Sequence, residues 1–280
     1  MEFRILGPLQ GTVGGRPLRL SGRQSRLVLA SLLLAPGRVV PVERLIEAVW
    51  GVASPVSART QIAIAVSNVR RAIGDTAGSV IETVAPGYRL RGDASWIDTR
   101  TVEERVAEGR AAAAVGRLDE AVLFYRGALL QWRGPVLHGL DRSNLAPAVL
   151  PWEELRLSLH EEAAEIDLAR GRHRTLAGAL MPVVAEEPYR ERLRYLLMMA
   201  LVRSGRLNEA LAVYREGRRL LAGELGLEPG PGLRGLNESI LRNARDARDA
   251  QDAGDARSTR STRNARMARG PARSARHACC

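Results

Sequence analysis

Polar side chains between residues 57 and 71 have the chemistry needed to read the edges of DNA bases. Apolar residues in this stretch recur at intervals of 4, 3 and 4: Ile62, Val66, Val69 and Ile73. At about 100° per residue, these four share one face of a helix. The opposite face and its flanks carry hydrogen-bonding groups and one apolar side chain: Ser57, Arg59, Thr60, Gln61, Ile64, Ser67, Asn68, Arg70 and Arg71. Arg pairs with guanine, Asn or Gln pairs with adenine, and Ile64 can contact a thymine methyl group. We therefore predict a recognition helix that enters the major groove of double-stranded DNA.

A cationic hairpin is predicted directly after this helix. Residues 80–84 and 88–91 read as strands joined through Ala85-Pro86-Gly87. The second strand carries Tyr88, Arg89 and Arg91, which suit the adjacent minor groove or its phosphates. An amphipathic helix with a merely solvated polar face is the alternative interpretation of residues 57–73. The neighbouring hairpin favours DNA binding over that alternative.

The elements that must position these residues follow from turn and capping signals. Three short strands are expected at 3–6, 9–13 and 17–20, separated by Gly-Pro and Gly-Gly pairs. Helices are expected at 23–35, 41–50 and 57–73, with Ser21 capping the first and Pro41 in the first turn of the second. A small sheet, three helices and a hairpin are the layout of a winged helix-turn-helix domain. We assign it to residues 1–95.

The following segment, residues 96–242, is predicted to be all-α with a tetratricopeptide-like repeat. Gly116-Arg-Leu-Asp-Glu-Ala121 resembles Gly205-Arg-Leu-Asn-Glu-Ala210, and a weaker copy begins at Gly171. Gly171 and Gly205 are 34 residues apart, which is the tetratricopeptide period. Gly116 lies 55 residues before Gly171, and the proline-rich stretch 133–151 accounts for the extra length. Stacked helix pairs of this kind typically serve as scaffolds and protein-binding surfaces. The fold class is therefore mainly α with two domains.

The distribution of charge and of cysteine along the chain bears on the tail and on the cellular compartment. Residues 1–95 carry a net charge of +6, residues 96–242 are neutral, and residues 243–280 carry +5. The last segment has almost no large apolar residue and is predicted to be a disordered tail. The only cysteines, Cys279 and Cys280, are adjacent at the C-terminus and cannot hold a fold together. With no signal peptide or membrane span in the sequence, we expect a cytoplasmic, nucleoid-associated protein.

Catalytic chemistry is poorly supported. The chain contains no lysine, so the phosphate-binding loop G-x-x-x-x-G-K-[ST] cannot be formed. Its histidines have no metal-ligand spacing, and no internal cysteine can serve as a nucleophile. We predict no enzyme activity, no cofactor and no metal site.

Several co-linear motifs resemble those of the SARP family, the Streptomyces antibiotic regulatory proteins. In the first domain these are Phe3-Arg-Ile-Leu-Gly-Pro8, Gly37-Arg-Val-Val40, Val49-Trp-Gly51, Ala58-Arg-Thr60, Val69-Arg-Arg71 and Pro86-Gly-Tyr-Arg-Leu90. Further along they are Trp132-Arg-Gly-Pro135, Ala169-Arg-Gly-Arg-His173, Glu187-Pro-Tyr-Arg-Glu-Arg192, Arg203-Ser-Gly-Arg206 and Glu224-Leu-Gly-Leu-Glu-Pro229. The resemblance spans about residues 2–242. It implies an OmpR-type winged helix followed by a bacterial transcriptional activator domain.

The resemblance also implies a function. Members of the family activate secondary-metabolite gene clusters by binding direct repeats near promoters and recruiting RNA polymerase. Their DNA-reading parts correspond here to residues 59–71 and 88–91. The sequence departs from the family at Asn68, where members often carry Arg, and this predicts a changed sequence preference.

The sequence is compatible with two functions of different classes. The first is a promoter-specific DNA-binding activator that associates with further copies of itself through the helical domain. The second is a tetratricopeptide-like interaction scaffold without specific DNA readout. A steep fall of DNA affinity with salt is expected only for the first.

Overall fold

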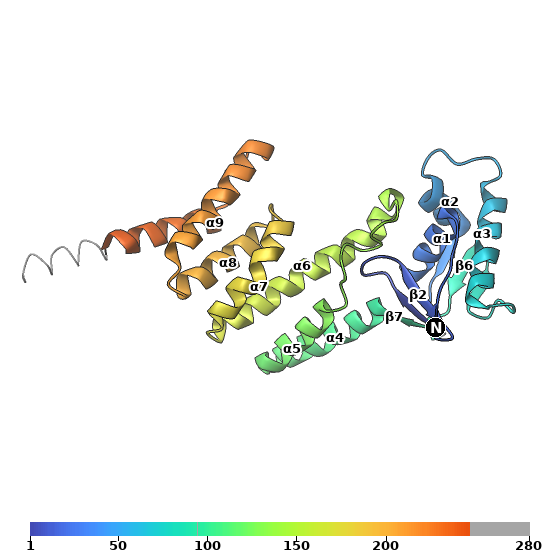
Figure 1. Ribbon diagram of the computed structural model, residues 1–280, viewed down its shortest axis with the longest axis horizontal. Helices are drawn as coiled ribbons and strands as arrows, with labels where there is room; N and C mark the ends of the chain where they lie inside the picture. Colours follow the sequence, from blue (N-terminus) through green and yellow to red (C-terminus); the bar gives the residue numbers. More distant parts are fainter. Residues whose placement is uncertain (94, 247–280) are drawn as a thin grey trace, which may run out of the picture. The chain divides into compact units, whose positions relative to one another are not determined.

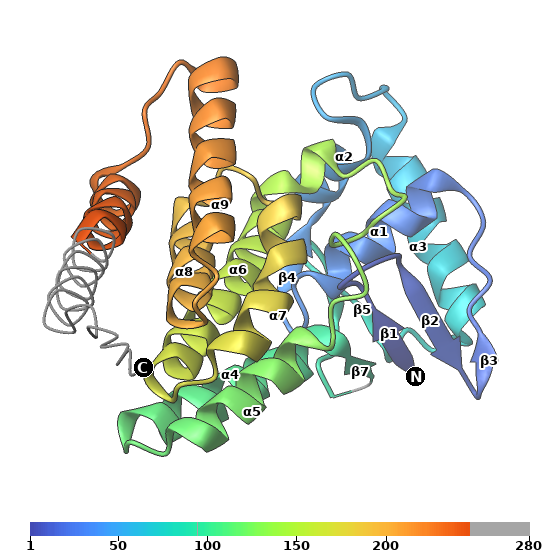
Figure 2. The same cartoon turned by 60° about the vertical axis from the view of Figure 1, so that its left-hand side comes forward.

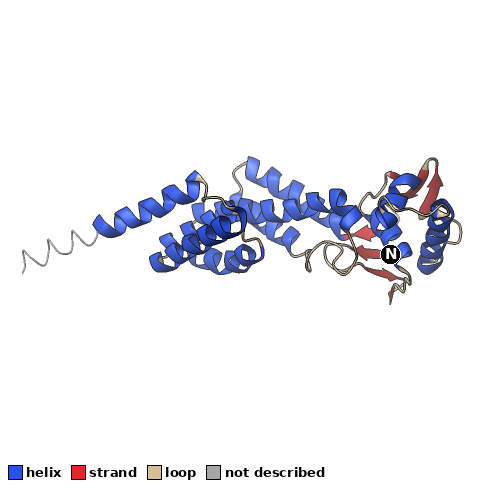
Figure 3. Cartoon of the chain, turned by 90° about the horizontal axis from the view of Figure 1, so that it is seen from above, coloured by secondary structure: helices blue, strands red, loops and turns tan. Residues whose placement is uncertain are grey.

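A computed structural model describes residues 1–93 and 95–246 of the chain (Figure 1). It divides into two compact units, the first from Met1 to Arg172 and the second beginning at His173. The predicted mainly helical class is confirmed. All strands of the described residues lie within the first 97 residues (Figure 3).

The first sheet is formed at the N-terminus. Its strand order is β3-β2-β1-β7, with strands β1 (Glu2–Arg4), β2 (Gln10–Val13), β3 (Arg16–Pro17) and β7 (Trp96–Ile97). β1 pairs antiparallel with β2 and parallel with β7. The first strand is shorter than predicted because the backbone N–H groups of Ile5 and Leu6 donate to the buried carboxylate of Asp98, at 2.9 and 3.0 Å, instead of to a strand.

The winged-helix core follows, with its three helices and its hairpin in the expected order. Its elements are α1 (Arg23–Leu33), β4 (Val39–Pro41), α2 (Val42–Trp50), α3 (Ala58–Ile73), β5 (Ile81–Val84) and β6 (Gly87–Leu90). α1 lies at the centre and packs against α2, α3 and β6 (Figure 2). Every residue of α1 from Leu27 to Leu33 is buried, which explains the nearly continuous apolar run in its sequence.

Two local predictions were wrong. The cap of α1 is Gly22, not Ser21, and no side chain bonds to the open backbone groups there. Residues 39–41 form β4, and its last residue Pro41 precedes α2 as the N-cap instead of lying in its first turn. β4 completes a second sheet of order β4-β6-β5, because Val39 and Val40 pair with Arg89 and Tyr88 of the hairpin. A three-residue strand is too short to give an alternating pattern in the sequence.

The first unit continues beyond the predicted winged helix. It includes α4 (Asp98–Ala114), α5 (Leu118–Leu129), the short helix η1 (Ser143–Leu145) and α6 (Ala146–Ala169). The proline-rich stretch lies along the loop after β1: Arg133 N donates to Leu6 O at 2.8 Å, and Leu137 N donates to Ile5 O at 2.9 Å. Together with Asp98, these contacts join residues 96–172 to the N-terminal sheet in one compact body.

The second unit contains α7 (His173–Glu186), α8 (Glu191–Arg203), α9 (Leu207–Leu220), the π-helical segment η2 (Leu221–Leu225) and a helix over 231–246. Each glycine of the predicted repeat ends a helix in a left-handed conformation, with φ of 77° at Gly116, 76° at Gly171 and 76° at Gly205. The repeated Gly-Arg pairs therefore mark equivalent helix-to-helix turns.

The predicted tail falls mostly outside the described residues. Residues 243–246 continue the last helix, and the remainder of the tail, including Cys279 and Cys280, is not described. Among the described residues, no helix has the length and apolar character needed to cross a membrane. The same residues contain no group of His, Cys, Asp and Glu side chains arranged to hold a metal ion.

Candidate nucleic-acid interface

α3 buries one face and exposes the other, as the sequence period predicts. Ile62, Val66, Val69 and Ile73 are 0 to 3% exposed, and they pack toward α1 and α2. On the opposite side, an exposed strip runs along the helix at intervals of 4, 3 and 4: Thr60, Ile64, Ser67 and Arg71. Ile64 is 55% exposed in the middle of this strip. Exposure of such a large apolar side chain to water is unfavourable, whereas the same side chain can contact a thymine methyl group.

The C-terminal end of the strip holds an Arg and an Asn together. Arg71 Nη1 donates to Asn68 Oδ1 at 3.2 Å, and both side chains remain partly open to solvent. The remaining donors of this pair are free to meet a base edge or a phosphate.

At the N-terminal end of α3, the predicted polar residues are held by neighbours. Ser57 occupies the N-cap position, but its hydroxyl accepts a hydrogen bond from Gln61 Nε2 at 2.9 Å instead of capping the backbone. Gln61 Oε1 accepts from Gln24 Nε2 of α1 at 2.8 Å. Arg59 is ion-paired with Glu43 of α2. The pKa of Glu43 is lowered, first by a hydrogen bond from its own backbone and then by Arg59.

Arg70 faces the hairpin and not the exposed strip. Its Nε donates to Ile81 O at 2.9 Å, and its Nη2 donates to Thr83 Oγ1 at 3.0 Å. Its guanidinium also lies 5.9 Å from the centre of the Tyr88 ring. These contacts fasten α3 to both strands of the hairpin, so Arg70 sets the position of the wing. The sequence grouped it with the exposed polar residues because it flanks that face.

The cations of the wing are partly neutralised. Arg89 forms a 2.6 Å ion pair with Glu82 on the adjacent strand, and Arg91 forms one of 2.6 Å with Asp93. Tyr88 and Arg89 are half-buried, whereas Arg91 is exposed just beyond the end of β6. Arg91 is therefore the most accessible of the three predicted wing residues.

Asp75 is a structural residue of this surface that was not predicted from the sequence. It is 5% exposed and accepts hydrogen bonds from the backbone N–H groups of Ser79, Val80 and Ile81 at 2.7, 3.2 and 2.9 Å. Burial opposes ionisation of this carboxyl group, but these hydrogen bonds outweigh it and lower its pKa. Asp75 thus fixes the turn between α3 and the wing. An Asp directly after a helix-ending Gly was the available signal.

Family models match both parts of the chain. The model for the C-terminal domain of transcriptional regulatory proteins matches residues 15–90, which include α3 and the wing. The model for the bacterial transcriptional activator domain matches residues 97–241.

Individual relatives agree with these matches. The transcriptional regulatory protein EmbR of Mycobacterium tuberculosis is 39% identical over 247 residues, covering 86% of this chain and 63% of EmbR. The regulatory protein AfsR of Streptomyces coelicolor is 37% identical over 243 residues, which are 86% of this chain and 24% of AfsR. The regulatory protein DnrI of Streptomyces peucetius is 36% identical over 253 residues, which are 86% of this chain and 92% of DnrI. The chain thus spans less than two thirds of EmbR and AfsR but nearly all of DnrI.

A solved structure is also similar. Mycobacterium tuberculosis EmbR in complex with a low-affinity phosphopeptide aligns with a TM-score of 0.76 at 36% identity, covering 90% of this chain and 69% of that one.

Proposed function

The chain belongs to the SARP family of transcriptional regulators, and we propose that it is a sequence-specific DNA-binding activator of a secondary-metabolite gene cluster. The observation that carries the proposal is the exposed strip of α3. In this proposal Thr60, Ser67 and Arg71 read base edges in the major groove, and Ile64 contacts a thymine methyl group.

Five of the other predicted residues have different roles in the proposal. Arg59 and Arg91 contact phosphates, each exchanging its carboxylate partner for the DNA backbone. Arg70, Gln61 and Ser57 act indirectly, because their side chains are bonded to other parts of the protein. Their hydrogen bonds hold the helix and the wing in place.

We further propose that copies bind head-to-tail on direct repeats one helical turn apart. That spacing places neighbouring copies on the same side of the duplex. The helical residues 96–242 then provide contacts between copies or with RNA polymerase. The loop between α2 and α3 is a second candidate for the polymerase contact. Val52 and Val56 in this loop are fully exposed, and exposed apolar side chains are typical of protein-binding surfaces.

The experiment is a genome-wide footprint followed by affinity measurements on the operator it identifies. We expect Arg71→Ala to weaken operator binding by about 1–3 kcal/mol and to relax discrimination at one base position. Arg19→Ala removes an exposed cation outside α3 and the wing and serves as the matched control. Affinity should fall by roughly 0.9 log unit per log of salt for each phosphate contacted. Equal operator affinity of the wild type and the Arg71→Ala variant, with a flat salt dependence, would refute DNA reading by α3.

A further inference from the structure

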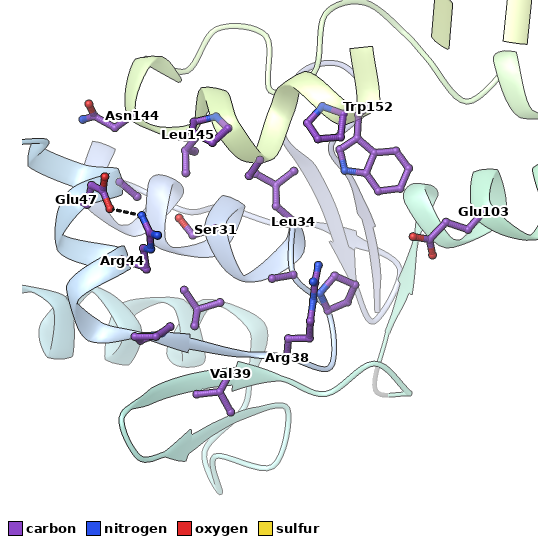
Figure 4. A pocket seen from close by; sticks show the side chains of 18 residues that line it. Ser31, Leu34, Arg38, Val39, Arg44, Glu47, Glu103, Asn144, Leu145 and Trp152 are labelled. Atoms are coloured by element: carbon purple, nitrogen blue, oxygen red, sulfur yellow. Dashed lines mark hydrogen bonds and ion pairs between the residues drawn. The ribbon is translucent and has the colours of Figure 1, made fainter. Parts of the chain in front are cut away.

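A cleft in the first unit separates the winged helix from the helices that follow it (Figure 4). It has a volume of about 960 Å³. One wall comes from the end of α1, from β4 and from α2, all within the segment matched by the regulatory-protein model. The other wall comes from α4, η1 and the start of α6, within the segment matched by the activator-domain model. Small-molecule sites occur preferentially at such boundaries between domains and have volumes of this order.

The cleft is lined by apolar and proline side chains together with several polar ones. Leu34 and Val39 form part of one wall, and Trp152 belongs to the other, where it lies near Leu34 (Figure 4). Four prolines line the same space: Pro36, Pro41, Pro147 and Pro151. Because proline fixes its φ angle, the backbone around the cleft loses little entropy when a ligand binds. A planar apolar molecule fits beside the indole ring.

Two charged side chains in the cleft have no bonding partner among the described residues. Arg38 directs its guanidinium into the space between Leu34 and Trp152, and Glu103 enters from α4 (Figure 4). The other charged pair, Arg44 and Glu47, is closed on itself at 2.8 Å. An unpaired guanidinium binds a carboxylate or sulfonate in a bidentate manner, and an unpaired carboxylate accepts a hydrogen bond from an N–H or O–H group.

We propose that this cleft is an effector site for a small planar aromatic acid that also carries a hydrogen-bond donor. The acid group binds Arg38, the donor binds Glu103, and the aromatic body lies against Trp152. Because the two walls come from the two family segments, occupation of the cleft changes how the winged helix is held and therefore its affinity for DNA. The regulatory half of this inference rests on the proposed DNA-binding function.

The test uses the full chain and the fluorescent probe 8-anilinonaphthalene-1-sulfonate, which combines a naphthalene ring, a sulfonate and an anilino N–H. Binding is first measured without DNA, so that the cleft is tested independently of the proposed function. We expect saturable binding at one site. Arg38→Ala should weaken it about tenfold, as for loss of one charge-assisted contact. Glu103→Gln should weaken it by a smaller factor, and Arg19→Ala, which removes an exposed cation outside the cleft, should leave it unchanged.

Trp152→Leu removes the indole against which the aromatic body of the probe is proposed to lie, and thermal melting checks that this variant folds. If it does not fold, Arg38→Ala and Glu103→Gln still decide the test. Multiple weak sites, or binding that Arg38→Ala leaves unaltered, would overturn the assignment of the cleft. The second measurement is operator affinity at saturating probe, where we expect a change of about fivefold that is absent in Arg38→Ala. Probe binding with unchanged operator affinity would overturn the effector role. If neither the wild type nor Arg38→Ala bound the operator, that result would count against the DNA-binding function instead.

Discussion

Replacing Asp75 with alanine removes the acceptor that fixes the turn between α3 and the wing. Three backbone N–H groups donate to this carboxylate, and one belongs to Ile81, which is completely buried. Water cannot reach that donor, so leaving it unpaired costs about 1–3 kcal/mol. The N–H groups of Ser79 and Val80 are more accessible to water, so the loss of each of their hydrogen bonds costs roughly 0.5–1 kcal/mol of stability. We expect a total loss of about 3 kcal/mol in the free energy of unfolding of the first unit.

The pH dependence has a definite sign. The pKa of Asp75 is lower in the folded protein, so its contribution to stability is complete above the unfolded value of about 3.9 and is lost as the pH falls through the folded value. The difference in stability between the wild type and Asp75→Ala should therefore be constant from pH 8 to pH 5 and shrink below about pH 4.

Urea unfolding followed by circular dichroism measures the overall loss, and hydrogen exchange of residues 79–81 measures it locally. Asp93→Ala is the matched control. It removes a carboxylate close to the wing that is exposed and paired with Arg91, so its effect should be much smaller than that of Asp75→Ala. If Asp75→Ala were as mild as Asp93→Ala, or if their difference were unchanged at pH 3, the role assigned to Asp75 would be wrong.

Three further predictions follow from the packing of the first unit. A fragment of residues 1–95 should show no cooperative thermal unfolding, whereas residues 1–172 should unfold cooperatively, because the short fragment lacks the partners that bind the loop after β1; a sharp transition in the short fragment would contradict this. Gly109→Ala should destabilise by about 1–3 kcal/mol in urea unfolding, since its Cβ would lie 2.5 Å from the Tyr125 ring, while Gly178→Ala, with open space around it, should be neutral or slightly stabilising. Changing both valines of loop 51–57 to serine should reduce transcription in vitro without altering operator affinity; an equal loss of both would place the loop on DNA and not on polymerase.

Local periodicity allowed the sequence to predict the helix α3 and its buried face. The buried residues Ile62, Val66 and Val69 recur every three or four positions, and α3 presents them and the opposite strip as that period requires. The Gly-Arg pairs were equally informative, because a left-handed helix end needs glycine at the same place in every copy. These features depend on residues within one or two turns of each other.

Only the tertiary structure distinguished Arg70 from Arg71. The two are neighbours of one type, yet Arg70 bonds to the wing while Arg71 stays on the exposed strip, and that difference depends on where β5 lies. The same holds for Asp98, whose carboxylate accepts hydrogen bonds from Ile5 and Leu6 more than 90 positions earlier in the chain. Contacts between residues distant in sequence decide which polar groups form hydrogen bonds within the protein. A helical period reports which side of a helix is buried, and only the surrounding elements decide what each polar side chain on its borders can reach.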